Sequence, residues 1–496
     1  MSKYLMGIDG GTDGIRVGFY DIHGHQMGFE SSGYITNYPR PGWAEQNPVD
    51  WWNGLGMACN TLLQRFLLQP KDIIAIGLDA TSCTVVSSDD EGNPLLPALL
   101  WMDTRAANEA DVFTRLGHRY HQGAPASAEW MGPKALWLKN HYPDLWSRTR
   151  LTEYVDWLSY HLTGRWTTSQ NNATCRWYYD VTSGGWPLDF FSEAGLSDVI
   201  RKFPELVLPL GAVVGPLTSV AANHLGLVEG IPVAQGGVDA FVASVGLNAL
   251  SEGNLGFITG SSHLYITESR RPIHGSGIFG SFPQAVVPET EMIEGGQVST
   301  GSVLKWFVTN YMSGDTNSLS TWDGLANDLS PGSDGLIVLP HWQGSRTPFT
   351  DARARGMIYG LTLHHKPVHV YRAIMEGVAY GTRTILDLFA ERGVCINKII
   401  AGGGLLNSSI WLQIHADVAG KPIALPEVSQ AAALGSAIVA ATAVGLYPSI
   451  ADAANHMVRY RDTVLPDPSR IQSYASYYRV YQKLDSAVRA VGCQIE

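Results

Sequence analysis

Two stretches decide the fold: Leu5-Met6-Gly7-Ile8-Asp9-Gly10-Gly11-Thr12, and Leu255-Gly256-Phe257-Ile258-Thr259-Gly260-Ser261-Ser262 in the second half of the chain. In each, a short apolar strand ends in glycine and a small hydroxyl residue, and a second strand follows (15–20 and 264–267). A hairpin of this kind brings backbone N–H groups and a hydroxyl against phosphate oxygens, and glycine allows the close approach. A third glycine turn, Ala401-Gly402-Gly403-Gly404, precedes a helix-like run. Three such turns predict a nucleotide held in a cleft between two lobes.

The composition limits the kinds of protein to consider. A chain of 496 residues exceeds the size at which one hydrophobic core stops growing, so two domains are expected. Hydrophobic residues make up 45% and charged residues 16%, as in ordinary globular proteins. The net charge of −11 argues against nucleic acid or an anionic membrane surface as a partner.

Cysteine usage and the absence of long apolar runs suggest a cytoplasmic protein. Without any C-x-x-C pair, the cysteines disfavour a disulfide framework or a zinc site. A strand begins directly after Met1-Ser2-Lys3, which leaves no room for a signal peptide, and no apolar run reaches transmembrane length. A homodimer is left open as the oligomeric state. The five cysteines are scattered along the chain: Cys59, Cys83, Cys175, Cys395 and Cys493.

The order of predicted elements in the first half indicates a mixed sheet covered by helices. A hairpin meander opens the chain, and helices then alternate with strands. We place a first lobe at residues 1–249. Its predicted elements are a helix at 48–68, strands at 73–78 and 84–87, a helical region at 106–170, a connector at 204–216, a strand ending at 239, and a helix at 240–247.

The second half repeats this rhythm without close sequence similarity. We place a nucleotide-binding lobe at 250–496, so that both lobes are α/β and ribonuclease-H-like around a central cleft. Its predicted elements are strands at 254–267, a helix at 302–311, a strand at 335–339, a helix at 368–392, a strand at 398–401, and helices at 408–419 and 431–443.

Two aspartates stand at predicted strand ends beside glycine turns. Asp9 can hold Mg²⁺ close to nucleotide phosphates, although a turn-forming aspartate that caps its own loop would look the same. Asp239 is flanked by Gly237 and Ala240, so its carboxylate would be the only polar group there. It can accept a proton from an attacking hydroxyl, and it can also cap the following helix.

Longer motifs resemble the FGGY family of carbohydrate kinases, which have the actin-like ATPase fold. Gly356-Met-Ile-Tyr-Gly-Leu361, followed after a gap by His369-Val-Tyr-Arg-Ala-Ile-Met-Glu376, fits the C-terminal signature of that family throughout. Gly402-Gly-Gly-Leu-Leu-Asn407 resembles its adenosine-binding turn, and Gln430-Ala-Ala-Ala-Leu-Gly-Ser-Ala-Ile438 the helix that follows. The segment Met131–Trp137 fits the N-terminal signature less well. The resemblance covers essentially the full length.

The resemblance implies that the lobe at residues 1–249 binds the sugar, and it implies roles for particular residues. Asp239 would be the general base on the sugar hydroxyl, and Asp9 and Asp239 would hold Mg²⁺. ATP would be the phosphate donor. Lys305 could equally be an ordinary solvated helix lysine. The implied ATP-binding residues lie in the glycine turns and the helix that follows the second: Gly11, Thr12, Asp13, Gly260, Ser261, Gly301, Lys305, Gly403, Gly404 and Asn407.

Several positions resemble the ribulokinase branch of the family. Thr81-Ser82 stands where glycerol kinases carry Arg-Glu, so that pair is missing here. Xylulose kinases carry Met-His near the same place, and that pair is missing too. Asp13, the run Ser127-Ala-Glu-Trp130 and the run Ile293-Glu-Gly-Gly-Gln297 are also ribulokinase-like. We therefore expect phosphorylation of a terminal hydroxyl of a pentulose, with ribulose preferred. A polyol kinase acting on ribitol or erythritol, and a xylulose kinase, are the nearest alternatives.

The expected sugar contacts are polar, because a wrong isomer is rejected when it leaves a polar group of the site unpaired. Trp101 and Trp130 would pack on the carbon skeleton, or would simply belong to the core. Arg176 could instead be an exposed arginine in a surface ion pair. The expected substrate-binding residues are Ser82, Trp101, Asp103, Glu129, Arg176, Asp239 and Glu294.

Two other classes of protein use the same fold. One is a non-catalytic sugar sensor, against which the joint presence of Asp9, Thr12 and Asp239 argues. The other is an ATP-hydrolysing chaperone or filament protein, for which the sequence shows no peptide-binding module. A sugar kinase turns over ATP only with its sugar, whereas a chaperone turns it over alone.

Overall fold

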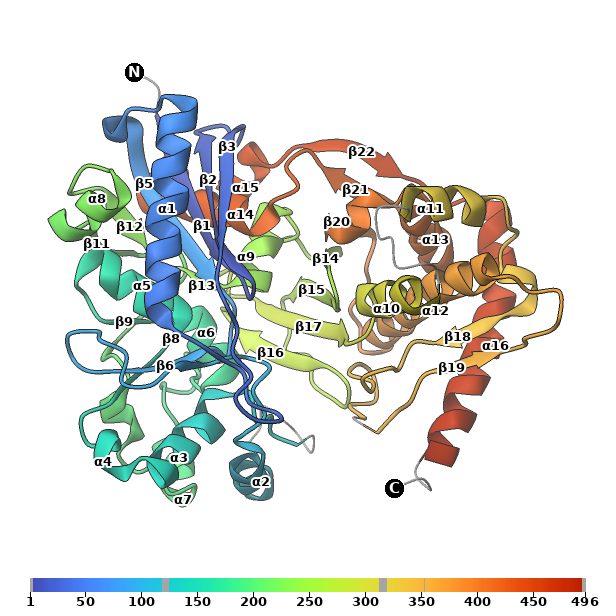
Figure 1. Ribbon diagram of the computed structural model, residues 1–496, viewed down its shortest axis with the longest axis horizontal. Helices are drawn as coiled ribbons and strands as arrows, with labels where there is room; N and C mark the ends of the chain where they lie inside the picture. The colour runs from blue at the N-terminus through green and yellow to red at the C-terminus, as the bar shows by residue number, and fades with distance from the viewer. Residues whose placement is uncertain (1–2, 118–124, 312–318, 352, 493–496) are drawn as a thin grey trace.

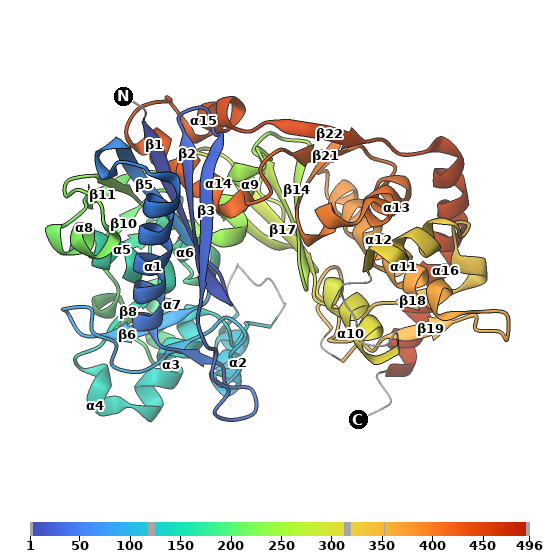
Figure 2. The ribbon, with the colours of Figure 1, turned by 45° about the horizontal axis from the view of Figure 1, so that its top comes forward.

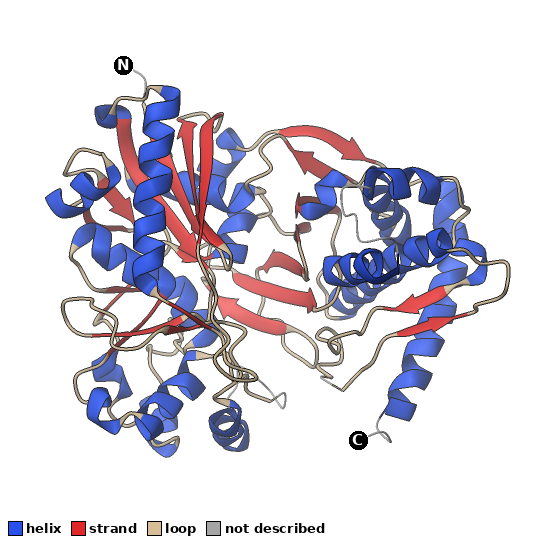
Figure 3. Cartoon of the chain, viewed as in Figure 1, coloured by secondary structure: helices blue, strands red, loops and turns tan. Residues whose placement is uncertain are grey.

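A computed structural model describes residues 3–117, 125–311, 319–351 and 353–492, and it contains two large mixed sheets with helices around them (Figures 1 and 3). The first sheet has the strand order β11-β12-β5-β1-β2-β3, with β13 also paired to β5. Its strands are β1 (Tyr4–Gly10), β2 (Gly14–Asp21), β3 (Gln26–Gly33), β5 (Ile73–Ala80), β11 (Val213–Pro216), β12 (Pro232–Ala234) and β13 (Gly237–Val238).

The second sheet has the order β16-β17-β15-β14-β20-β21-β22. Its strands are β14 (Asn254–Thr259), β15 (His263–Ser269), β16 (Phe279–Pro283), β17 (Glu291–Gln297), β20 (Lys398–Gly403), β21 (Ile423–Pro426) and β22 (Tyr460–Val464).

The two sheets share one topology. In the first, β1, β2 and β3 form an antiparallel meander, and β5 and then β12 add in parallel beside β1. In the second, β14, β15 and β17 form the meander, and β20 and β21 add in parallel beside β14. The expected fold of two ribonuclease-H-like lobes is therefore confirmed. The boundary between residues 249 and 250 remains a prediction.

The first lobe also contains a smaller four-stranded sheet, which the sequence pattern did not predict. Residues 106–170 were expected to be helical throughout; this is wrong in part, because strand β8 (Arg150–Glu153) joins a four-stranded sheet with β4 (Glu45–Gln46), β6 (Val85–Ser88) and β7 (Ala98–Leu99). Residues 118–124 lie outside the described part. The helices are α1 (Pro48–Phe66), α2 (Ala107–Leu116), α3 (Met131–His141), α4 (Pro143–Trp146), α5 (Tyr154–Thr163), α6 (Gln170–Arg176), α7 (Leu188–Glu193) and α8 (Ser219–Leu225).

The helices of the second lobe pack mainly around one long central helix, α12. The chain then ends in a second long helix, α16, which the sequence pattern did not predict. None of the helices in the described ranges has the length and apolar composition needed to cross a bilayer. The helices are α10 (Gly301–Tyr311), α11 (Leu319–Asn327), α12 (Pro367–Glu391), α13 (Ser409–Ala419), α15 (Ile450–Met457) and α16 (Pro468–Gly492).

Two helices form the layer between the sheets. Helix α14 (Ala431–Ala443) belongs to the second half of the sequence but packs on β1 and β5 of the first sheet, while α9 (Asp239–Gly246) packs on α14 and on β14. Figure 2 shows both helices between the blue strands and the green strand β14. The two halves of the chain are therefore joined by a shared helical layer.

The contact between α14 and the first sheet is a backbone contact. A Cβ atom on Gly7 would lie 1.9 Å from the carbonyl oxygen of Ala433, and a Cβ on Gly77 would lie 1.9 Å from that of Ser436. On the other side of the helix, a Cβ on Gly435 would lie 2.0 Å from the carbonyl oxygen of Val242 in α9. Glycine is needed at these positions because any side chain would separate the layers.

We expect Gly7→Ala to destabilise the fold strongly, because the added methyl group meets a backbone carbonyl that cannot move aside. Overpacking of this kind costs about 1–3 kcal/mol or more, measurable by chemical denaturation. Gly324→Ala is the matched control, since a Cβ there meets no atom within 4 Å and the residue lies in the middle of helix α11. Equal stability of Gly7→Ala and the wild type would contradict this account of the layer.

Candidate active site

Three aspartates meet at one edge of the first sheet. Asp9 on β1 and Asp79 on β5 are partners in register, and Gly237 of β13 pairs with Asp79, so that Asp239 follows at the start of α9. The carboxyl ends of parallel strands commonly form ligand sites in α/β folds. Asp9 and Asp79 are buried, whereas Asp239 is partly exposed.

Each carboxylate in this cluster has a different partner. Arg16 of β2 donates from Nη1 to Asp9 Oδ2 at 2.7 Å. The Ser436 hydroxyl of α14 donates to Asp79 Oδ2 at 2.7 Å, while Asp79 Oδ1 has no hydrogen-bond partner within the described chain. Asp239 Oδ1 accepts from the Ala240 N–H at 2.7 Å. One arginine thus faces three carboxyl groups.

The crowding of carboxylates changes their proton affinities. Burial raises the pKa of Asp239 to about 7, and the charge of Asp9 adds to the increase. Burial and the facing Asp9 carboxylate raise the pKa of Asp79 well above its usual value. The surplus of carboxylate oxygens, one of them unpartnered, suits a hard divalent cation such as Mg²⁺.

The first phosphate turn lies above this cluster. Gly11, Thr12 and Asp13 connect β1 to β2, and the Gly11 N–H donates to the Gly14 carbonyl at 3.1 Å to close the turn. Asp13 is exposed. Trp101 donates from its indole Nε1 to the Thr12 hydroxyl at 3.0 Å. Trp101 is therefore directly connected to this turn.

The second phosphate turn opens a cavity of about 340 Å³ in the second lobe. Gly403 and Asn407 are not among its lining residues; at Gly403, φ is +88°, and a Cβ there would lie 2.0 Å from the Thr259 carbonyl oxygen. A glycine turn followed by an apolar slot suits the phosphates and the base of a nucleotide. The cavity is lined by five of the residues that the resemblance implies for ATP, Gly260, Ser261, Gly301, Lys305 and Gly404, and by His263, Leu304, Val308, Leu319, Leu405 and Trp411.

A second cavity, of about 190 Å³, lies between the lobes beside Asp239. Asp103 does not line it: this side chain is fully buried and binds Arg105 and the Ala44 N–H instead. We refer to this cavity as the acceptor cavity, because it borders Asp239, the predicted general base. Its polar and aromatic lining includes Thr12, Thr81, Ser82, Trp101, Glu129, Arg176, Asp239, Ser262, Glu294 and Arg346.

The two tryptophans expected at the sugar differ in their settings. The Trp101 side chain is 38% exposed and lines the acceptor cavity. Trp130 is buried and lines a larger adjoining cavity of about 370 Å³, which shares Glu129, Arg176 and Arg346 with the first. Trp101 is therefore the better placed of the two to cover a bound sugar.

A buried ion pair joins the two lobes in the wall of the acceptor cavity. Arg176, at the end of α6, donates from Nη2 to Glu294 Oε2 of β17 at 2.8 Å, and both side chains are buried. The alternative of an exposed, surface-paired Arg176 is wrong. Burial alone would lower the Arg176 pKa, but Glu294 more than offsets this effect, so that the arginine stays charged.

Two buried charged residues that sequence reasoning missed hold the Ser82–Cys83 turn. Cys83 has φ of +59° and is bound on both sides of its backbone: its N–H donates to Glu153 Oε2 at 2.9 Å, and its carbonyl accepts from Lys134 Nζ at 2.7 Å. Lys134 also donates to the carbonyls of Leu99 and Leu100, next to Trp101. No sequence signal distinguishes such a lysine, because its partners are main-chain carbonyls.

Glu153 extends this network to the helix that carries Arg176. It accepts from Asn172 Nδ2 at 2.9 Å and from Trp177 Nε1 at 2.6 Å. Burial raises the pKa of Glu153, and its hydrogen bonds lower it. Burial has the larger effect, so the resulting pKa is about 7. One carboxylate thus positions both the Ser82 turn and the Arg176 helix at the acceptor cavity.

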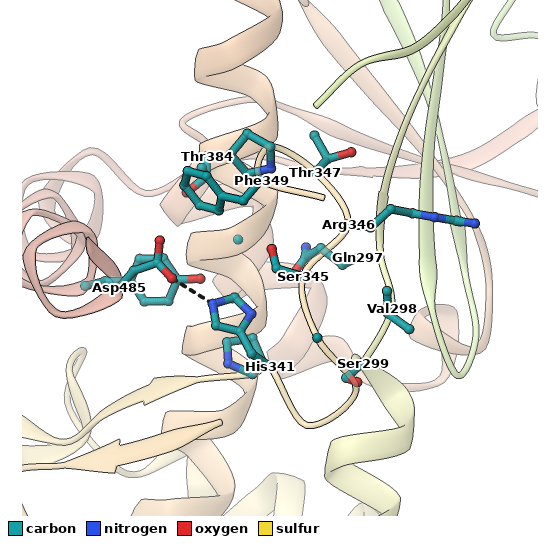
Figure 4. Close-up of a pocket in the computed structure, with 15 residues that line it drawn as sticks. Gln297, Val298, Ser299, His341, Ser345, Arg346, Thr347, Phe349, Thr384 and Asp485 are labelled. Atoms are coloured by element: carbon teal, nitrogen blue, oxygen red, sulfur yellow. Dashed lines mark hydrogen bonds and ion pairs between the residues drawn. The ribbon is translucent and has the colours of Figure 1, made fainter. Parts of the chain in front are cut away.

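Arg346 faces the acceptor cavity from the second lobe. Figure 4 shows its side chain directed away from a neighbouring small cavity in which His341 Nε2 contacts Asp485 Oδ1 at 2.8 Å. The guanidinium lies 4.0 Å from Glu129 Oε2 of the first lobe. Arg346 therefore adds a cation that the sequence motifs did not single out.

A separate cluster of Asp334, His364 and His369 has metal-binding residue types but not metal-binding hydrogen bonds. His369 Nδ1 accepts from the Lys366 N–H at 3.0 Å, which leaves the proton of the neutral ring on Nε2, 3.4 Å from Asp334 Oδ2. Metal-bound histidines instead donate from the ring nitrogen that does not hold the metal. The cluster is better explained as a hydrogen-bonded start of α12.

The two-lobed actin-like fold, the phosphate turns and the acceptor cavity define an ATP-dependent small-molecule kinase. The model of the FGGY family of carbohydrate kinases, N-terminal domain, matches residues 4–246, and the model of the C-terminal domain matches 255–444. The chain belongs to the FGGY family of carbohydrate kinases. It is thus a carbohydrate kinase with a sugar substrate and ATP as its phosphate donor.

The relatives and solved structures agree on the fold but differ in their sugars. A ribulokinase from Geobacillus thermodenitrificans is 30% identical over 97% of this chain and 94% of its own length. A gluconate kinase from Lactobacillus acidophilus has a TM-score of 0.90 at 21% identity, with 100% of both chains covered. A xylulose kinase from Rhodospirillum rubrum has a TM-score of 0.87 at 24% identity, covering 99% of this chain and 100% of its own. These two structures support the fold alone.

We expect Glu153→Leu to weaken sugar binding, because it strands the Cys83 N–H and two side-chain donors in a buried site. Each lost partner costs about 1–3 kcal/mol, so the free energy of unfolding should fall and the KM for the sugar should rise, with the KM for ATP unchanged. Glu153→Gln is the milder comparison: its amide oxygen can still accept from the Cys83 N–H and Asn172, and only the bond from Trp177 is lost, so the sugar KM should rise less. An unchanged sugar KM in a folded Glu153→Leu protein would contradict the positioning role.

Proposed function

We propose that the chain transfers the γ-phosphate of ATP to a terminal hydroxyl of a pentulose, with ribulose as the preferred acceptor. The observation that carries the proposal is the acceptor cavity, which joins Asp239 to the Arg176–Glu294 pair and the Ser82 turn. The similarity to ribulokinases over almost the whole chain supports the choice of sugar. A cavity with both charges and hydroxyls fits a polyhydroxylated acceptor better than an apolar one.

Asp239 is the proposed general base. It borders the acceptor cavity at the start of α9, and its pKa of about 7 allows it to take up a proton from the sugar hydroxyl near neutral pH. Arg16 and the Ala240 N–H favour the ionised form and so keep the pKa from rising further. This balance leaves about half of the base ionised at pH 7 and keeps the ionised form basic enough to accept a proton.

The arginine–glutamate pair is the proposed orienting element for the sugar. Arg176 comes from the first lobe and Glu294 from the second, so a sugar that binds both contacts the two lobes at once. The ion pair uses Glu294 Oε2. We therefore expect Glu294 to serve the sugar as a fixed, already paired acceptor rather than as a free carboxylate.

Asp9 and Asp239 would hold Mg²⁺ at the phosphates of ATP. The bound ion would neutralise charge that develops on the transferred phosphoryl group. Thr12 lies next to both the carboxylates and Trp101, and it would orient the phosphates toward the sugar.

Asp239→Asn should lower kcat by roughly 10²–10⁴-fold, the usual weight of a general base, while the Kd of the sugar stays similar. Wild-type kcat/KM should rise with pH and level off above about pH 7. The reason is that Asp239 acts as a base only when it is ionised, and burial raises its pKa to about 7. Steady-state rates from pH 5 to 9 test both points. A variant with wild-type turnover would remove Asp239 from the mechanism.

Ribulose should be phosphorylated faster than xylulose, ribitol, erythritol, gluconate and glycerol in a coupled assay of ADP release. Glu294→Ala should raise the KM for ribulose by about tenfold or more, because it also leaves Arg176 buried and unpaired. The double variant Arg176→Met/Glu294→Ala removes that unpaired charge and separates the two effects. Faster turnover of a polyol or gluconate would overturn the choice of ribulose and leave the kinase assignment standing.

A further inference from the structure

A buried histidine in the nucleotide cavity has no role in the account given so far. His263 is the first residue of β15, directly after the second phosphate turn, and its side chain is 1% exposed. It lines the 340 Å³ nucleotide cavity. Its ring nitrogen Nδ1 is buried and has no hydrogen-bond partner within the described chain.

The direction of the His263 side chain follows from its strand. Leu264, the next residue of β15, lines the acceptor cavity, and successive residues of a strand point to opposite faces of the sheet. His263 therefore points away from the sugar and into the second lobe. There its ring lies 5.0 Å from the Phe257 ring and 5.8 Å from the Trp411 ring.

The surroundings keep this imidazole neutral. Burial, and then the nearby His415, lower the pKa of His263 well below its usual value. A neutral imidazole offers one N–H donor and one nitrogen acceptor. Nδ1 has almost no accessible surface, so a ligand in the cavity would meet the other ring nitrogen, Nε2, which also has no hydrogen-bond partner within the described chain. A ligand that supplies this missing partner gains binding free energy.

We propose that His263 selects the nucleotide by hydrogen bonding to the nucleoside part of ATP. Phosphates are better served by the Gly260–Ser261 turn and by Lys305, which line the same cavity. A neutral imidazole among apolar side chains instead suits ribose hydroxyls and purine nitrogens, because it offers one donor and one acceptor. The inference rests on ATP as the phosphate donor and is independent of which sugar is phosphorylated.

A neighbouring residue offers a matched control. His415 of α13 is also buried, its pKa is lowered to about 3 by burial, and its Nε2 has no hydrogen-bond partner within the described chain. Its ring lies 5.8 Å from that of His263, but it does not line the nucleotide cavity. A purely internal role, such as a water molecule shared by the two rings, would make the two histidines behave alike.

The test is calorimetric titration of ADP and of adenosine into His263→Phe, His263→Asn and His415→Phe. His263→Phe should raise the Kd of both ligands by about tenfold, the usual weight of one buried hydrogen bond. His263→Asn, which keeps a donor and an acceptor, should recover much of the loss. His415→Phe should leave both Kd values unchanged.

Two outcomes would overturn the proposal: unchanged binding of ADP by His263→Phe, or equal weakening by the His263 and His415 variants. Loss of ADP binding with intact adenosine binding would also overturn it, because the contact would then be to phosphate. If His263→Phe does not fold, the ring ¹⁵N chemical shifts of His263 in the wild type, recorded with and without adenosine, answer the same question. Unperturbed shifts would reject the contact.

Discussion

The rest of the structure depends on the backbone contact between α14 and the first sheet. Gly7 and Gly77 leave no room for a side chain, so a helix from the second half of the chain lies directly on β1 and β5. The same helix supplies the Ser436 hydroxyl to Asp79, the innermost carboxylate of the catalytic cluster. Helix α14 therefore both packs the two halves of the chain together and positions a carboxylate of the aspartate cluster.

The acceptor side is organised by buried charge rather than by apolar packing. Lys134 and Glu153 hold the backbone at Cys83 from opposite sides, and Glu153 continues to the helix that carries Arg176. Buried ionic groups contribute little net stability compared with apolar residues of the same size. Their value here is that they fix the positions of loops, which apolar side chains do less specifically. The polar groups of the proposed sugar site are therefore held in place by the fold itself.

Much of the candidate site could be predicted from the sequence, because many of its residues stand at the ends of strands. Asp9, Asp239 and the glycine turns at Gly260 and Gly404 stand at such ends, and local pattern predicts them. Asp79 also ends a strand and could have been found by the same reasoning. Lys134 and Glu153 could not, since their partners are far away in the chain. The strand β8 inside an expected helical region was missed because its pairing with β6 is a tertiary effect.

Strand β15 separates the two substrates by a single residue. Ser262 and Leu264 belong to the wall of the acceptor cavity, whereas His263 between them belongs to the nucleotide cavity. The backbone of this segment is held by β14 on one side and β17 on the other. Under the proposed roles of the two cavities, sugar preference and donor preference would be separable traits in evolution. Substitutions on one face of this segment would change the sugar and leave the ATP site on the other face intact.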